Sequence, residues 1–203
     1  MESLAHLFAW VCGQNAEHTW APGEVLLPCC QRCTGLYVGA GVAALLHRWL
    51  RPCLSGRFLE MHGAFLVLMV PFGFHWLSQG PALRAAMGVL FGFGLVTFLW
   101  LVPGARAGSS DAARPAAAAT LAYFAGVAFT AALVPALGTW GGGAAAVFLG
   151  GLVFAGLMVL GVLAVTNVGF GLTTAARWAR RTLVLPHPGG PAPAVGQTPG
   201  QGK

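Results

Sequence analysis

The sequence predicts an all-α integral membrane protein with about five transmembrane helices. Of its 203 residues, 57% are hydrophobic and only 8% are charged, whereas a soluble domain carries roughly a quarter charged residues. Apolar runs near the length of a bilayer span recur along the chain. The period-two alternation of a barrel strand does not appear, and a lone span must satisfy its own backbone hydrogen bonds. Each run is therefore predicted to be a helix.

The chain divides into three parts by composition. Residues 1–33 form a cysteine-rich N-terminal segment, residues 34–182 the helix bundle, and residues 183–203 a tail rich in Pro and Gly. The tail has no apolar periodicity, so we expect it to be disordered. The predicted spans lie near residues 34–50, 61–79, 82–102, 115–137 and 144–166.

The arginines predict the orientation of the spans. They follow the first, third and fifth spans: Arg48, Arg51, Arg57, Arg106, Arg114, Arg177, Arg180 and Arg181. The connections at 80–81 and 138–143 carry no charge. Because basic loops stay in the cytoplasm, we expect the N-terminus outside and the tail inside, in a multi-pass protein of the cytoplasmic membrane.

The charge distribution and the glycine patterns indicate which binding partners to expect. The formal charge of +6 comes from arginines that lie between apolar segments, which does not suggest a nucleic-acid partner. The lipid bilayer is the expected partner. Small-xxx-small patterns at Gly35/Gly39 and Gly88/Gly92 favour close helix crossing, here within the bundle rather than between two copies.

The residues that could bind a metal ion or form a disulfide lie on the predicted outer side. Four cysteines precede the first span: Cys12, Cys29, Cys30 and Cys33. Cys30-Gln-Arg-Cys33 is a Cys-x-x-Cys pair, a spacing that lets two sulfurs meet on one ion or in one disulfide. His75 and Gln79 lie four residues apart, on one side of a helix whose end reaches the same face.

The other histidines carry less weight. His6, His47 and His62 fall at predicted interfaces or loops, where a histidine usually needs no special role. His18 lies on the cysteine side and is kept as a spare ligand. Asn167, near the inner end of the fifth span, is expected to form a hydrogen bond between helices.

The cysteine block is similar to a known family. Cys12-Gly-Gln14 followed by Leu27-Pro-Cys-Cys-Gln-Arg-Cys-Thr-Gly-Leu-Tyr-Val-Gly39 resembles the bacterial and archaeal membrane proteins called domain of unknown function 2085. The resemblance covers roughly residues 8–102 and implies a membrane protein, but no activity. The family pattern has histidine where Gly13 stands and aspartate where His75 stands.

A metal site is the first hypothesis for these residues. If the family positions form a metal site, this chain keeps three thiols and offers an imidazole in place of a carboxylate. The set Cys12, Cys30, Cys33 and His75 would suit tetrahedral zinc, with Gln79 and His18 in support.

Three alternatives remain open. Cys30 and Cys33 could carry thiol–disulfide redox chemistry, with Arg32 between them favouring a thiolate. Cys12 could form a structural disulfide with Cys30 or Cys33, since thiols outside the cytoplasm tend to oxidise. The chain could also be a non-catalytic accessory subunit of a larger membrane complex. No catalytic residue is assigned, because the sequence has neither a Gly-x-Ser-x-Gly elbow nor a phosphate-binding loop with its lysine.

Overall fold

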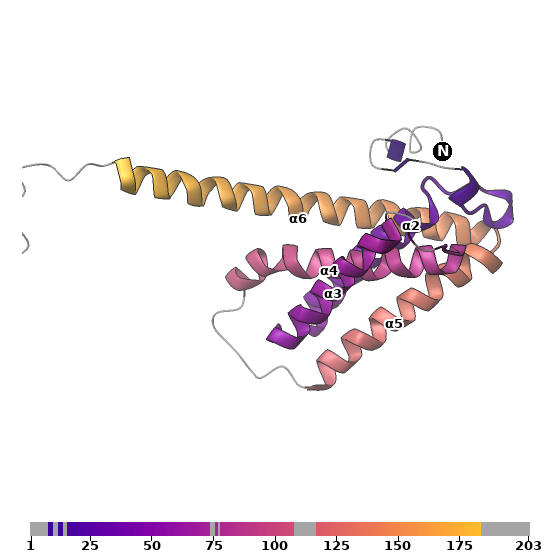
Figure 1. Cartoon of the computed structure of the whole chain (residues 1–203), viewed down its shortest axis with the longest axis horizontal. Coiled ribbons are helices and arrows are strands. Elements are labelled where there is room, and N and C mark those ends of the chain that lie inside the picture. Colours follow the sequence, from indigo (N-terminus) through magenta and orange to yellow (C-terminus); the bar gives the residue numbers. More distant parts are fainter. Residues whose placement is uncertain are drawn as a thin grey trace, which may run out of the picture. The chain divides into compact units, whose positions relative to one another are not determined.

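The computed structural model describes residues 8–9, 12–13, 16–73, 76, 78–107 and 117–183. Two short 3-10 turns, η1 (Ala16–His18) and η2 (Pro22–Glu24), precede the long helices of this part. These helices are α2 (Gln31–Leu50), α3 (Gly56–Gly73), α4 (Pro81–Ala107), α5 (Ala117–Trp140) and α6 (Gly143–Leu183) (Figure 1). The chain forms two compact units, Met1–Val168 and Gly169–Lys203.

Three of the described helices are long and apolar enough to cross a membrane. The qualifying segments are Pro81–Val102 in α4, Ala117–Trp140 in α5 and Gly143–Arg180 in α6. Polar residues such as His47 in α2 and Glu60 in α3 lower the hydropathy of the other two helices. The all-helical class and the membrane character therefore agree with the sequence prediction.

Two helices end at residues other than those predicted. The second span was expected near 61–79, but α3 begins at Gly56 and ends at Gly73, and Trp76, Ser78 and Gln79 are not helical. Pro71 contributes to this early end because it lacks an N–H and crowds the preceding turn. At the other end of the chain, α6 continues to Leu183, well past residue 166. The predicted disordered tail lies outside the described residues from 184 onwards.

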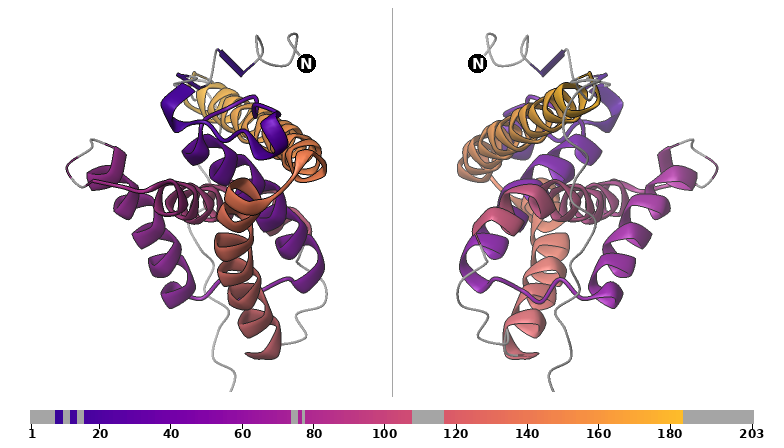
Figure 2. Two further views of the ribbon diagram at one scale, coloured as in Figure 1. Left: turned by 90° about the vertical axis from the view of Figure 1, so that its right-hand side faces the viewer. Right: turned by 90° about the vertical axis from the view of Figure 1, so that its left-hand side faces the viewer.

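α2 and α4 lie side by side and form the closest crossing of the first unit (Figure 2). The crossing is lined by the glycines of the two small-xxx-small patterns: Gly35 and Gly39 in α2, Gly88 and Gly92 in α4. A Cβ added at Gly35 would collide with the backbone carbonyl of Ala85, and one at Gly88 with that of Arg32. The patterns thus serve packing within the bundle, as predicted.

The segment before α2 packs on the connection between α5 and α6. Trp20 is 7% exposed, and its indole lies where a Cβ at Gly138 would have to go. Gly23 has a positive φ of 58° and lies against the backbone of Gly142 and Gly143, where a side chain would not fit. The start of α2 and the end of α5 therefore share one end of the first unit.

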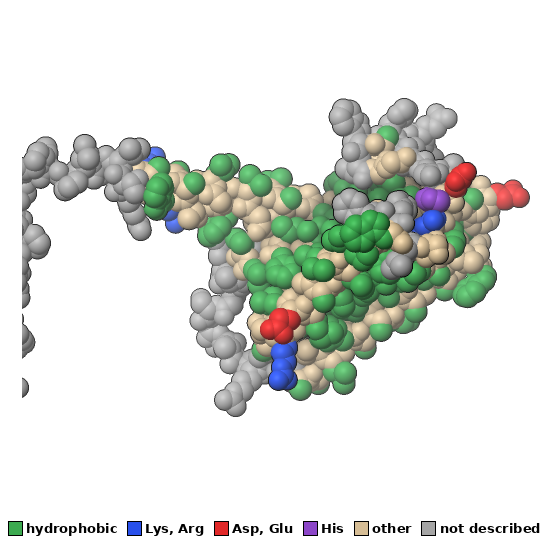
Figure 3. All heavy atoms as spheres, in the orientation of Figure 1, with side chains coloured by type: hydrophobic (Ala, Val, Ile, Leu, Met, Phe, Trp, Pro, Cys, Tyr) green, Lys and Arg blue, Asp and Glu red, His purple; other side chains and the backbone are tan. Residues whose placement is uncertain are grey.

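The rest of the first unit is joined mainly by apolar contacts. Hydrophobic side chains are spread over the face of this unit in Figure 3, among backbone and other uncharged side chains, while acidic and basic side chains lie toward its two ends. Asn167 of α6 donates a hydrogen bond from Nδ2 to the backbone oxygen of Leu99 in α4, at 2.9 Å. This bond confirms the predicted interhelical role of Asn167, and the apolar face suits contact with lipid.

Candidate metal centre

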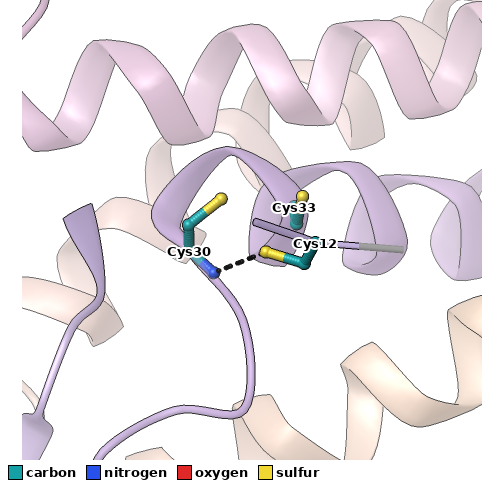
Figure 4. Close-up of side chains that lie close together, drawn as sticks. All are labelled: Cys12, Cys30 and Cys33. Atoms are coloured by element: carbon teal, nitrogen blue, oxygen red, sulfur yellow. Dashed lines mark hydrogen bonds between the residues drawn. The ribbon is translucent and has the colours of Figure 1, made fainter. Parts of the chain in front are cut away.

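Three cysteine sulfurs converge where the N-terminal segment meets α2. The Sγ atoms of Cys12, Cys30 and Cys33 all lie within 4.8 Å of one another (Figure 4). Cys30 and Cys33 are three residues apart at the start of α2, so they project from the same side of the helix. Cys12 reaches them from a separate segment of the chain.

The helix start helps to hold the cluster. Cys30 is the N-cap of α2, with extended backbone angles of φ −66° and ψ 162°, and its N–H donates to Cys12 Sγ at 3.3 Å. The first N–H groups of a helix lack partners within it, and its dipole places partial positive charge there. The hydrogen bond and the helix dipole therefore favour negative charge on the Cys12 sulfur, as a metal thiolate requires.

Cys12 is anchored by its own local contacts. Its N–H donates to the backbone oxygen of Phe8 at 2.8 Å, and its side chain is buried. Phe8 is 1% exposed, and its ring lies 5.9 Å from that of Tyr37 in α2, centroid to centroid. A buried aromatic contact thus fixes the segment that brings Cys12 to α2.

The donor set fits a soft or borderline metal ion. Zinc–sulfur bonds of about 2.3 Å in a tetrahedron place sulfurs roughly 3.8 Å apart, so only small side-chain shifts would bring the three Sγ atoms onto one ion. Hydrogen bonds with the Cys12 and Cys30 thiols raise the pKa of Cys33, and burial raises it further. An ion bound here must therefore displace thiol protons.

Cys29 lies beside the cluster but outside the converging set. Its Sγ is 3.5 Å from Thr34 Oγ1 within the first turn of α2. Burial raises the pKa of the Cys29 thiol to about 12, so it stays protonated at neutral pH. None of the five cysteines forms a disulfide in the structure.

Two further predicted site residues, Arg32 and Gln79, bind the same backbone oxygen near the end of α3. Arg32 donates from its guanidinium to the backbone oxygen of Phe72 at 2.9 Å, and Gln79 Nε2 donates to the same oxygen at 2.8 Å. Both side chains thus join the end of α3 to its neighbours. His18 is not among the residues whose ligand atoms gather at the cysteines, and His75 lies outside the described residues.

A second group of polar side chains was missed by the sequence analysis. It joins four helices around the hydroxyl of Tyr123 in α5, with His47 from α2, His62 from α3 and Thr97 from α4. The two histidines were expected to need no special role, yet both are buried. The available signal was that these four polar residues fall in four different predicted spans, each in the half nearer the predicted cytoplasmic end.

Comparison with known proteins supports the resemblance seen in the cysteine block. Residues 12–98 match the family model described as "Predicted membrane protein (DUF2085)". No curated protein and no solved structure matches the chain. The matched residues run from Cys12 through α2 and α3 into α4 and include all three cysteines of the cluster. Residues 12–98 are therefore similar to the membrane protein family called domain of unknown function 2085.

Proposed function

We propose that this chain is a multi-pass protein of the cytoplasmic membrane that holds a zinc-like metal ion at the outer face. Cys12, Cys30 and Cys33 supply three thiolates, and His75 supplies the fourth ligand. The proposal rests on one observation: three cysteine sulfurs from two segments of the chain lie within 4.8 Å of one another. Thiolate and imidazole ligands suit zinc better than they suit magnesium or calcium.

The orientation in this proposal has all five described long helices crossing the membrane, with the N-terminus outside. The arginines after the first, third and fifth spans support it, since basic loops stay in the cytoplasm. It is also supported by the contact between Trp20 and Gly138. That contact places the N-terminal segment at the same end of the first unit as the uncharged 138–143 connection, and both are expected outside.

The choice of His75 as fourth ligand rests on its neighbours. Arg32 and Gln79 both donate to the Phe72 carbonyl. These bonds hold the end of α3, three residues before His75, against the first turn of α2. Cys33 lies in that same turn.

The expected role of the ion is structural. Three thiolates and one imidazole would fill all four positions of tetrahedral zinc, and filled sites of this kind stabilise folds rather than activate water. The ion would connect the N-terminal segment to α2 and, through His75, to the chain that follows α3.

The test is a metal analysis combined with a thiol count. The protein is purified in detergent without added metal, and bound metals are measured beside free thiols under denaturing conditions. About one zinc per chain is expected, and it should be lost in Cys30→Ser and in His75→Ala. Cys29→Ser is the matched control, because Cys29 is a buried neighbour outside the converging set and its variant should keep the ion.

Two outcomes would overturn the proposal. A metal-free protein with all thiols titrating would remove the site altogether. A metal-free protein in which two thiols appear only after reductant is added would establish a disulfide instead. Reactivity of that disulfide toward quinones would then separate a redox protein from a structural disulfide.

A further inference from the structure

The Tyr123 hydroxyl is surrounded by groups that can bind a metal. The Nε2 atoms of His47 and His62 each lie 3.2 Å from the Tyr123 oxygen. Thr97 Oγ1 lies 3.3 Å from the same oxygen and 3.0 Å from His47 Nε2. All four residues are buried, with at most 3% of each exposed. Four helices thus direct two imidazoles and two hydroxyls at one point in the first unit.

His62 is held as a metal-binding histidine usually is. Its Nδ1 lies 2.7 Å from the backbone oxygen of Phe58, and because a carbonyl can only accept, Nδ1 must donate. In the neutral imidazole this leaves the lone pair of Nε2 facing Tyr123. Histidine ligands almost always donate their other ring N–H to a carbonyl, a carboxylate or water, which fixes the ring in this way.

The distances around Tyr123 also fit ligands of a shared ion. The three contacts of the Tyr123 oxygen measure 3.2–3.3 Å, and its single hydroxyl hydrogen cannot serve all three at once. Nitrogen and oxygen ligands about 2.0–2.1 Å from a tetrahedral zinc lie roughly 3.3 Å from one another. The separations of 3.0–3.3 Å around the Tyr123 oxygen and between His47 and Thr97 lie close to this value.

The surroundings would keep water away from an ion. The ring of Trp100 stacks on His47 with centroids 5.8 Å apart, and Phe58 stacks on His62 at 4.2 Å. Phe93 and Phe124 pack against Tyr123 from α4 and α5. Such an apolar shell holds the rings in position and controls solvent access to a metal site.

We propose that His47, His62 and Tyr123 form a second metal site, for a divalent transition ion such as zinc, with the Thr97 hydroxyl as the neighbouring oxygen. On binding, the phenol O–H bond breaks, its proton leaves to solvent, and the Tyr123 oxygen bonds the ion. The phenolate reduces the net charge of the ion and its ligands from two to one, which lowers the cost of burying them. The site shares no ligand with the cysteine cluster, so either proposal can fail alone.

The test uses zinc itself on the full-length protein. After loading and removal of free metal, about two zinc ions per chain are expected, one in each site. Zinc binding should also produce a tyrosinate band in the ultraviolet difference spectrum. The chain has two tyrosines, so Tyr37→Phe is a matched control that also removes a buried phenol. Tyr123→Phe and His62→Gln should each lose one zinc and the tyrosinate band, whereas Tyr37→Phe should lose neither.

A Cys30→Ser protein separates the two sites. It should lose the zinc of the cysteine cluster and still show the tyrosinate band. The second site would be overturned if zinc loading of the wild-type protein gave no tyrosinate band, a result that requires no variant to fold. It would equally be overturned if Tyr123→Phe, eluting as a folded species in the same detergent, kept the zinc content of the wild type.

Discussion

The cysteine cluster at the start of α2 and the histidine–tyrosine cluster near its end are assembled in opposite ways. Cys30 and Cys33 are neighbours on one helical turn, and only Cys12 comes from elsewhere. His47, His62, Thr97 and Tyr123 come from four helices, and no two share one. The first cluster depends on local helix geometry and one anchored segment, whereas the second depends on the packing of the whole bundle. Disturbing the bundle should therefore affect the second cluster more than the first.

The largest effect is expected at the α2–α4 crossing. Gly88→Ala places a methyl group against the backbone carbonyl of Arg32, which cannot move aside as a side chain can. We expect a loss of about 3 kcal/mol in the free energy of unfolding. Unfolding in detergent, followed by circular dichroism, measures the loss.

Gly150→Ala in α6 is the control for that variant, because a Cβ there meets nothing within 4 Å. It should leave stability unchanged or raise it by about 0.5 kcal/mol. Equal destabilisation by the two variants would contradict the close crossing.

A smaller effect is expected from removing the hydroxyl at the centre of the second cluster. In metal-free protein, Tyr123→Phe leaves His62 Nε2 without its described partner, at a cost of about 2 kcal/mol. Tyr37→Phe changes a buried tyrosine outside this cluster and should cost less than Tyr123→Phe. Denaturant unfolding in the presence of a chelator compares the two variants. A Tyr123→Phe protein with the same free energy of unfolding as the wild type would contradict the hydrogen bonds of the Tyr123 hydroxyl.

Acid should weaken zinc binding at the cysteine cluster. The raised pKa of Cys33 means that this thiol is protonated in the metal-free protein at neutral pH, so zinc must displace its proton. Apparent affinity should fall at least about tenfold for each unit by which the pH is lowered, since each displaced proton contributes one such factor. Chelator competition at several pH values measures the slope, and a pH-independent affinity would exclude thiol ligands.

The smallest effect is expected at Arg32, and it separates the metal and redox hypotheses. Arg32→Gln removes the donor to the Phe72 carbonyl and should cost about 1 kcal/mol of stability. The rate of alkylation of Cys30 and Cys33 should stay close to that of the wild type. A large fall in this rate would instead show that the guanidinium activates a thiolate, as the redox hypothesis requires.

The contrast between the clusters also explains which features were predictable. The pairing of Cys30 with Cys33 follows from their spacing alone, and the glycine patterns anticipated the α2–α4 crossing. The histidine–tyrosine cluster depends on which face each helix turns inward. Membrane helices are apolar on nearly all sides, so little in their hydrophobic pattern marks the inner face of α5 and points to Tyr123. The continuation of α6 to Leu183 was missed because a polar segment ends a span without ending a helix.

The contact between Trp20 and Gly138 has a consequence for how the protein is made. Trp20 leaves the ribosome early, but the surface on which it rests is synthesised only at the end of α5, the fourth of the five long helices. Until α5 has entered the membrane, the segment between Cys12 and Cys30 lacks the surface that orders it. The cysteine site is therefore expected to mature last, although its ligands are among the first residues translated, and a chain truncated before α5 should bind metal poorly.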